Sequence, residues 1–435
     1  MIRFINHASF MVTRGDTALV CDPWISGTAF DNGWNLIVEE EHPALQDITH
    51  IWYSHEHPDH FSISFLKSIP EYRRHQITVL YQRTPDKRVI NFCAKQGYQV
   101  RELDDGDRID LGNSLHITCG KVPFYDSWLY IETPEFTLLN SNDCILENPD
   151  RLSLIRRHVQ SCDILFTQFS YANWQDSRSN PAARRALAAD KLRRMKLQCE
   201  VFKPKFVVPF ATFVYFSHVE NSFMNAEINT PEAAVRYLER ECDAVPVLLQ
   251  PNEEWDGLTP HPNEAALAYW ADKYAAALAR DLRQCGPSVP LKTLFAKAEA
   301  MMERVHSQNN ALLIRAMQAL HIVRPVSFAL TDMGIAVSFD WKRGLRLLRT
   351  APADAVQMHS SSLAFIFDYD YGIDTVNVNA RFETDMAGKQ RMVRLFSVLA
   401  LSNTGRHIRF AEIGRYLNVP FLKQGLRTVG LVRQN

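Results

Sequence analysis

The sequence lacks the features that mark secreted, membrane or disulfide-rich proteins. Its eight cysteines form no C-x-x-C pair, it has no run of about 18 apolar residues, and its first residues lack a basic segment followed by an apolar stretch. We therefore expect reduced thiols, no membrane span, no secretory leader and a cytoplasmic location.

Neither sign of charge is in excess. The chain has 48 Lys and Arg residues against 49 Asp and Glu residues, which gives a formal net charge of -1. Such a balance supplies no long-range field for nucleic acid. No phosphate-binding glycine-rich loop and no internal repeat is visible either, so we expect no nucleic-acid partner.

The length of 435 residues and a hydrophobic content of 46% indicate more than one packed region. Up to about residue 250, short apolar strands alternate with helical segments, which is typical of an α/β fold. Strands are expected at Ala18–Cys21, His50–Tyr53, Gln76–Tyr81, Leu115–Thr118, Phe136–Leu139 and Asp163–Thr167, and helices at Ser62–Ile69, Lys87–Gln96 and Pro181–Lys203. Basic residues from Arg184 to Lys196 are interpreted as a solvated helix face.

The rest of the chain has a different pattern. Residues 251–322 show helical periodicity and are expected to form a helical connector. Residues 323–435 are expected to form a smaller α+β domain. Its strands are expected at Pro325–Leu330, Gly334–Phe339, Leu363–Tyr369 and Thr375–Phe382, followed by a helix near Arg391–Leu401.

Four candidate metal ligands stand within six positions directly after an apolar strand. They are His55, His57, Asp59 and His60. Alternation sends the first two the same way from an extended chain, and the turn around Pro58 lets the other two face a second point nearby. The spacing therefore predicts two adjacent metal ions.

The H-x-H-x-D-H pattern resembles the signature of the metallo-β-lactamase superfamily. That resemblance implies an αβ/βα sandwich with the metals at one edge of its two sheets. It further implies that Asp22 supports the ligand loop, that Asp143 bridges the metals, and that His218 is the last ligand.

One position departs from the hydrolases of this superfamily. They place a histidine shortly before the strand that begins near Trp128, but here the only strong oxygen ligand in that stretch is Asp126. His55, His57 and Asp126 would form a two-histidine, one-carboxylate set, which suits iron that activates dioxygen. In the alternative, Asp126 caps a turn and His116 or a water fills the shell.

Two further stretches, Asp22–Phe30 and Phe210–Asn225, resemble the corresponding domain of CMP-N-acetylneuraminate hydroxylases. A carboxylate ligand at the first metal is a further point of resemblance, to a diiron β-hydroxylase. The resemblance implies two Fe ions as cofactor, with two Zn or Mn ions as the alternative. The paired Cys-x-His motifs of a Rieske cluster do not occur, so an external ferredoxin or reductase is expected to deliver electrons.

These observations leave two enzyme classes open. The first is a non-haem diiron oxygenase that hydroxylates a C–H bond of a small or carrier-bound substrate. The second is a dinuclear hydrolase of an ester, amide, lactone or phosphodiester, in which Asp59 or Asp143 orients a metal-bound hydroxide. A non-catalytic, metal-stabilised scaffold is a third interpretation.

Other residues have weaker assignments. His7 is expected to contact the substrate or support the site, or else to be a core histidine. Gln168, Ser170 and Tyr171 follow a strand and are candidates for lining the pocket. The C-terminal unit faintly resembles sterol-carrier-protein-like domains, which implies an apolar groove for an acyl or prenyl group or the surface of a homodimer. In the alternative, the unit is a purely structural appendage.

Overall fold

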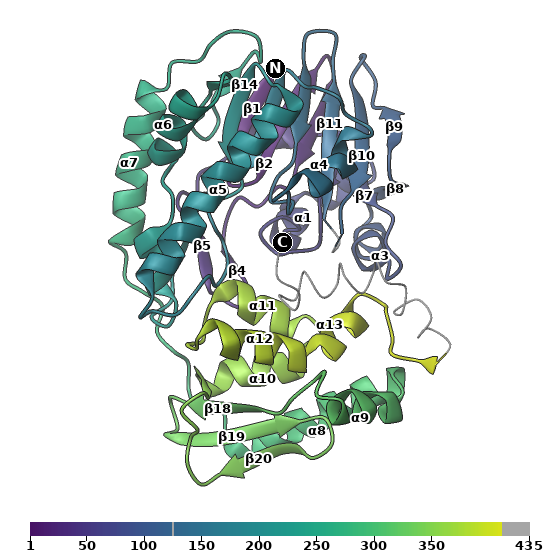
Figure 1. Cartoon of the computed structure of the whole chain (residues 1–435). Helices are drawn as coiled ribbons and strands as arrows, with labels where there is room; N and C mark the ends of the chain where they lie inside the picture. The colour runs from purple at the N-terminus through teal and green to yellow at the C-terminus, as the bar shows by residue number, and fades with distance from the viewer. Residues whose placement is uncertain (124–125, 411–435) are drawn as a thin grey trace.

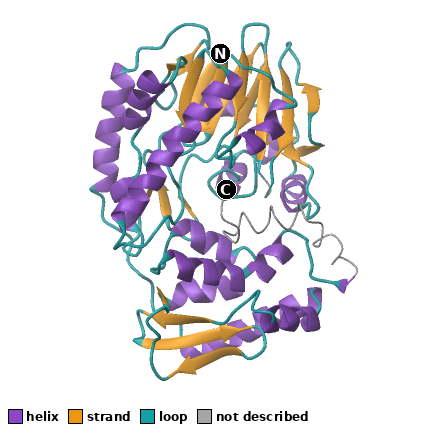
Figure 2. Cartoon of the chain, in the orientation of Figure 1, coloured by secondary structure: helices purple, strands orange, loops and turns teal. Residues whose placement is uncertain are grey.

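The computed structural model describes residues 1–123 and 126–410. Its N-terminal part contains two seven-stranded sheets (Figures 1 and 2). The first sheet has the order β17 (Glu254–Trp255), β1 (Ile2–Asn6), β2 (Ser9–Arg14), β3 (Thr17–Cys21), β6 (His50–Tyr53), β7 (Thr78–Gln82) and β8 (Gln99–Leu103). The second has the order β16 (Val245–Pro246), β14 (Phe206–Phe210), β13 (Ile164–Gln168), β12 (Thr137–Asn140), β11 (Ser127–Glu132), β10 (His116–Lys121) and β9 (Asp107–Asp110).

The two sheets pack face to face around one apolar core. The rings of Phe10 on β2 and Phe166 on β13 stack with centroids 4.6 Å apart, and Phe210 on β14 packs edge-on against both. Residues on the inner faces of both sheets, including Trp52 and Leu129, are fully buried in this core. Burial of this kind is the main stabilising term of a sandwich.

Helices cover the two outer faces. The first sheet is covered by α1 (Ile63–Ser68), α2 (Glu71–Arg74) and α3 (Arg88–Lys95), and the second by α4 (Pro149–Arg156), α5 (Pro181–Phe202) and α6 (Pro231–Glu241). Helix α1 begins where the Ser62 hydroxyl accepts a hydrogen bond from the Phe65 amide. The expected αβ/βα sandwich is therefore confirmed.

The stretch expected to be a connector contains three helices with different neighbours. Helix α7 (Glu264–Leu278) contacts α6, and its Trp270 lies in the core of the sandwich. Helix α8 (Leu291–Gln308) instead contacts α10 (Ser360–Asp368), and α9 (Ala311–Ala319) follows it. The boundaries at residues 250 and 322 stay predictions.

The C-terminal unit is α+β, as expected. Its four-stranded sheet has the order β20 (Gly344–Leu348), β19 (Ile335–Asp340), β18 (Val326–Leu330) and β21 (Val356–Met358). Helices α10, α11 (Gly372–Asn379), α12 (Met386–Leu395) and α13 (Ser397–Asn403) lie between this sheet and the N-terminal half (Figure 1). The part of the unit beyond residue 410 lies outside the described residues.

Two strand predictions in this unit are wrong. The segments predicted as strands at Leu363–Tyr369 and Thr375–Phe382 fall mainly in helices α10 and α11. In α10, Leu363, Ile366 and Phe367 are buried at helical spacing. Short apolar runs rich in β-branched and aromatic residues do not distinguish a buried helix from a strand.

A third, smaller sheet and a polar junction connect the two halves. The sheet has the order β15 (Val214–Phe216), β5 (Trp34–Leu36) and β4 (Thr28–Ala29). Beside it, the buried guanidinium of Arg381 donates to Glu220 Oε2 at 2.9 Å and to Asp31 Oδ2 at 3.0 Å. The Asn221 amide donates to the carbonyl oxygens of Gly33 and Asn379. The C-terminal unit is thus hydrogen-bonded to the loop after β4.

Candidate metal centre

The four clustered ligand candidates lie on the loop that leaves the carboxyl end of β6. The loop turns back on itself because the His57 carbonyl accepts hydrogen bonds from the amides of His60 and Phe61, at 3.0 and 2.7 Å. His55, Asp59 and His60 are buried. The expected turn around Pro58 therefore forms.

The ligand atoms approach each other at distances suited to coordination. His55 Nε2 lies 2.9 Å from His57 Nδ1, and His60 Nε2 lies 3.5 Å from Asp59 Oδ2 and 3.6 Å from Asp143 Oδ2. Nitrogen ligands about 2.0–2.1 Å from one metal ion lie about 3.3 Å apart at tetrahedral angles. The spacing therefore fits the edges of metal coordination shells.

Several of these buried atoms have no hydrogen-bond partner among the described residues. They are both ring nitrogens of His7, Asp59 Oδ1, His60 Nε2 and Asp143 Oδ1. An unpaired buried polar atom is costly. Because these atoms belong to metal-ligating side chains gathered at one place, the donor set fits bound cations.

Asp22 orients this cluster. Its carboxylate accepts hydrogen bonds from the Ser54 amide and hydroxyl, both at 2.7 Å, and lies 2.8 Å from His60 Nδ1. A carboxylate on Nδ1 favours the tautomer that leaves Nε2 free to bind a metal. The Ser54 hydroxyl is also 2.9 Å from His55 Nδ1, so one carboxylate supports the loop where the sequence analysis placed it.

Backbone strain is concentrated around the cluster. His7, Asp22, Asn142 and Ala211 each follow a strand and have positive φ angles of 36°, 42°, 35° and 55°. Non-glycine residues rarely adopt this conformation, and such strain tends to gather at functional sites. The Ala211 amide donates to the His7 carbonyl at 2.9 Å, which joins two of the strained strand ends across the sandwich.

The two remaining carboxylates reach the cluster from the second sheet. Asp143 lies 3.9 Å from His55 and 3.6 Å from His60, and therefore contacts both halves of the ligand loop. Asp126 Oδ1 lies 3.9 Å from His55 Nδ1. The Ser127 hydroxyl next to it donates to the Ser54 carbonyl at 2.6 Å.

The electrostatics reflect a crowded set of ionisable groups. Burial, followed by the positive His60, lowers the pKa of His55 well below its usual value. Burial alone would lower the pKa of His60, but Asp143, Asp59 and Asp22 raise it well above its usual value. Burial and then Asp143 raise the pKa of Asp126 well above its usual value. Bound cations would relieve the repulsion between these carboxylates.

The structure brings His7 into this cluster. Its Nε2 lies 3.4 Å from Asp59 Oδ2, and its ring packs edge-on against those of Trp24 and His60. The ligand atoms of His7, Asp59 and His60 all lie within 4.8 Å of one another, as do those of His55, His60 and Asp143. His7, Asp59 and His60 therefore form a group that could hold a metal ion.

The structure does not group His218 with these residues. Its ligand atom gathers instead with those of Glu220 and Cys285. Its Nδ1 accepts a hydrogen bond from the Glu220 amide at 3.2 Å, and burial, followed by Arg381, lowers its pKa to about 4. The turn after β15 directs this histidine toward the junction with the C-terminal unit.

His116 is far from the cluster along its own hairpin. It begins β10 opposite Glu132, whereas Asp126 adjoins the other end, where Lys121 pairs with Ser127. Five residues of extended strand span about 17 Å. Asp126 is therefore the carboxylate of this hairpin that lies beside His55.

The three candidates for lining the pocket, Gln168, Ser170 and Tyr171, have different hydrogen-bond partners. The side chain of Gln168 accepts a hydrogen bond from Lys191. Tyr171 is buried and donates to the Met224 carbonyl at 2.6 Å, and the Ser170 hydroxyl accepts from the Asn229 amide at 2.9 Å. Of the three, Gln168 is connected most directly to the cluster. Its backbone amide donates to the carbonyl of Asn142, which precedes Asp143.

Comparison with known proteins agrees with this geometry. Residues 1–124 match the family described as a β-lactamase superfamily domain. The N-terminal half has the metallo-β-lactamase fold. Its two sheets and covering helices have the arrangement that the resemblance implied.

Curated relatives are hydroxylases. Cytidine monophosphate-N-acetylneuraminic acid hydroxylase of Cricetulus griseus is 24% identical over 56% of this chain and 46% of its own length, and that of Mus musculus is 25% identical over 53% and 41%. The chain thus spans less than half the length of these relatives.

Similar solved structures include the diiron β-hydroxylase CmlA from Streptomyces venezuelae, with 14% identity, a TM-score of 0.39, and coverage of 57% of this chain and 52% of that one. An isothiocyanate hydrolase from Delia radicum gut bacteria has 12% identity, a TM-score of 0.40, and coverage of 58% and 97%.

Two residues near the candidate metal centre, Lys191 and Asp374, are not predicted from the sequence. Lys191 on α5 interacts electrostatically with Asp143, and burial, followed by Arg194, lowers its pKa to about 8. Arg184 on the same helix is buried. The interpretation of the run from Arg184 to Lys196 as a solvated face is therefore wrong at these two positions. A pattern of single residues does not reveal which side of a long helix faces the sheet.

The second missed residue comes from the C-terminal unit. Burial raises the pKa of Asp374 on α11 to about 6, and the side chain interacts electrostatically with His57 and Glu56. The Phe30 ring, from the loop bonded to Arg381, packs edge-on against His57 at 5.5 Å. The C-terminal unit therefore borders the metal loop, which no local sequence pattern indicates.

Proposed function

We propose that the chain is a dinuclear metalloenzyme, and that it is a non-haem diiron oxygenase that hydroxylates a C–H bond of a small or carrier-bound substrate. The observation that carries the proposal is Asp126 beside His55, where hydrolases of this fold have a histidine. Two histidines and one carboxylate are the ligand set of many Fe(II) sites that react with dioxygen.

Distances within the cluster support part of the ligand assignment. His55, His57 and Asp126 would hold the first iron, and Asp59 and His60 the second. Asp143 contacts both halves of the loop, which supports its assignment as the bridge. The two unpaired ring nitrogens of His7 support giving it the position at the second metal that the resemblance assigned to His218.

When bound, two Fe ions would supply the redox chemistry of dioxygen activation. The chain's own residues fix their surroundings. Asp143 sets the spacing of the two sites, and Asp22 holds the His60 ring through Nδ1. Trp24 and Phe30 pack against His7 and His57 and keep solvent from the ligand loop. Lys191 interacts electrostatically with Asp143, and Asp374 with His57.

A dinuclear hydrolase is the second candidate, and the contact between His7 and Asp59 favours it. With Zn or Mn ions, a bound hydroxide of lowered pKa would be the nucleophile. The Asp59 carboxylate, 3.4 Å from His7 Nε2, could then accept and pass on a proton. The donor set alone admits both metals and both reactions.

Metal analysis combined with two assays separates the candidates. An oxygenase should contain about two iron ions per chain, show ferric absorption bands, and take up oxygen when a ferredoxin or another reductant is supplied. Stoichiometric zinc together with ester or lactone cleavage would contradict the oxygenase and support the hydrolase.

A variant at the deciding position sharpens this test. Asp126→His would install the ligand typical of the hydrolases. We expect it to bind zinc better than the parent chain and to lose reductant-dependent oxygen uptake. Asp110→Asn, on the exposed strand β9, is a matched control that should change neither property. Unchanged metal preference in Asp126→His would remove the main support for iron.

The partners follow from the same proposal. An oxygenase of this kind needs electrons, which an external ferredoxin or reductase would supply. Among residues 1–123 and 126–410, no helix is long and apolar enough to cross a membrane. The cytoplasmic location, the homodimer and the sterol-carrier-like nature of the C-terminal unit stay predictions.

A further inference from the structure

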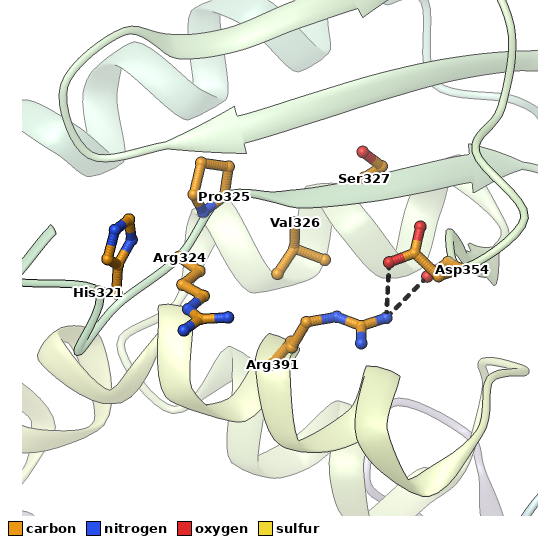
Figure 3. Close-up of a pocket in the computed structure, with 7 residues that line it drawn as sticks. All are labelled: His321, Arg324, Pro325, Val326, Ser327, Asp354 and Arg391. Carbon is orange, nitrogen blue, oxygen red and sulfur yellow. Dashed lines mark hydrogen bonds and ion pairs between the residues drawn. The ribbon is translucent and has the colours of Figure 1, made fainter.

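A second polar recess lies in the C-terminal unit, on different elements from the metal centre. It has a volume of about 420 Å³ and opens where the chain enters β18, next to α12 (Figure 3). Basic side chains of His321, Arg324 and Arg391 line it, together with Pro325 and Val326. A volume of this size is in the range of small-molecule sites.

The positive charge of the recess is only partly neutralised. Arg391 donates to the Asp354 carbonyl at 3.1 Å and pairs with its carboxylate at 3.0 Å (Figure 3). Among the described residues, Asp354 is the one acidic residue that lines the recess. Within the described part of the chain, the guanidinium of Arg324 has no hydrogen bond or ion pair.

A third guanidinium adds to the imbalance. Arg394 lies one helical turn after Arg391 on α12, and its Nε is buried without a hydrogen-bond partner among the described residues. Burial, followed by the charge of Arg324, lowers the pKa of Arg394. Arg394 is not among the residues that line the recess, but its charge repels that of Arg324, and an anion bound in the recess would offset this repulsion.

We propose that this recess binds the phosphate group of a small phosphorylated molecule. The planar guanidinium forks of Arg324 and Arg391 match the geometry of phosphate oxygens. Pro325 and Val326 offer an apolar surface for the organic part, and the Ser327 side chain, which also lines the recess, adds a hydroxyl. Inorganic phosphate presents the same charged group without the organic part.

The test uses the full chain with two probes, phenyl phosphate and inorganic phosphate, at constant ionic strength. Binding is followed by isothermal titration calorimetry. We expect saturable binding of both in the millimolar range or below, with phenyl phosphate the tighter. Equal affinity for both would support the site and assign it to free phosphate. Absence of saturable binding of either probe would overturn the proposal.

Variants test whether phosphate binds in this recess and whether its affinity depends on the positive charge there. Arg324→Met should weaken phosphate binding by about tenfold or more, because a charge-assisted hydrogen bond is lost. Asp354→Asn should strengthen it, because Arg391 loses its internal counter-charge. Arg343→Met, at an exposed arginine of the same unit, should leave the affinity unchanged.

One further variant separates this site from the metal centre. Phosphate is also a ligand for metal ions, so the affinity is measured again in Asp143→Ala. Retained binding there, together with weakened binding in Arg324→Met, supports the recess. Loss of binding in Asp143→Ala with no change in Arg324→Met would place the phosphate at the metals and overturn the proposal.

Discussion

The two halves of the molecule differ in where their unpaired buried polar atoms lie. In the N-terminal half, five buried atoms of His7, Asp59, His60 and Asp143 lack hydrogen-bond partners, and four strained residues surround them. In the C-terminal unit, the buried Asp340 accepts bonds from the amides of Lys342 and Arg343, at 3.0 and 2.8 Å. The unpaired atoms of the N-terminal half gather at one place. Those of the described C-terminal unit, such as Arg346 Nε, Ser362 Oγ and Asn377 Oδ1, lie on separate elements.

The apolar interiors differ in the same sense. Around the metal cluster, aromatic rings such as Trp24 and Phe30 pack against histidines. In the C-terminal unit, Phe339 packs against other aromatic rings, namely Trp341, Phe367 and Phe396, at 5.3 to 5.6 Å. We therefore expect substitutions in the first region to change metal affinity and those in the second to change stability.

The largest effect should come from the aromatic cluster. Phe339→Ala removes a fully buried ring and should lower the free energy of unfolding by about 3–5 kcal/mol, because the cavity does not fully close. Urea unfolding measures it. Metal content in the absence of denaturant should stay unchanged. A loss of metal with little change in stability would break the comparison.

The second effect concerns the two carboxylates from the second sheet. Asp143→Ala should remove both metals, with a loss of affinity of more than about 100-fold, because it contacts both parts of the ligand loop. Asp126→Ala should remove mainly the first metal. Elemental analysis of the purified variants distinguishes the two outcomes. Full metal content in Asp126→Ala would show that its assignment as a ligand is wrong.

A smaller effect on metal affinity is expected from Asp22, which contacts the ligand His60. Asp22→Asn keeps the shape of the side chain but weakens its hold on Ser54 and His60, so metal affinity should fall by about 10–100-fold. Competition with a chelator measures the affinity. Asp47→Asn, at an exposed position in the same half, is the control. Equal affinity in the two variants would deny Asp22 its positioning role.

How much of this could be predicted depended on how local the signal was. The ligand loop from His55 to His60 and its strand are a continuous pattern, so the sandwich fold was predicted. Helices α10 and α11 were mistaken for strands, because burial on all sides removes the polar face that gives a helix its periodicity. Here the structure depends on packing against α8, which is distant in sequence.

The site shows the same division. Asp143 follows an apolar strand and was found through the family pattern, and the cluster contains it. The position of His7 beside Asp59, the turn of His218 toward Glu220, and the approach of Lys191 all depend on how separate segments meet. Residue spacing along the chain does not predict contacts between segments that are distant in sequence.

The smallest predicted effect tests the boundary between the halves through its pH dependence. Burial raises the pKa of Asp374 from 3.8 to about 6, so its ionised form is disfavoured in the folded chain. Well below pH 3.8 the carboxyl is protonated in both states and has no effect. As the pH rises to about 6, the unfolded state loses its proton first, so the free energy of unfolding falls.

Asp374→Asn removes this dependence. Above pH 6 it should be more stable than the parent chain by an amount on the order of 1–2 kcal/mol, after allowance for partial exposure of the side chain. As the pH falls well below 3.8, the difference should disappear. Thermal unfolding across this range measures the difference. A difference that does not vary with pH would mean that Asp374 acts through packing and not through the charged surroundings of His57.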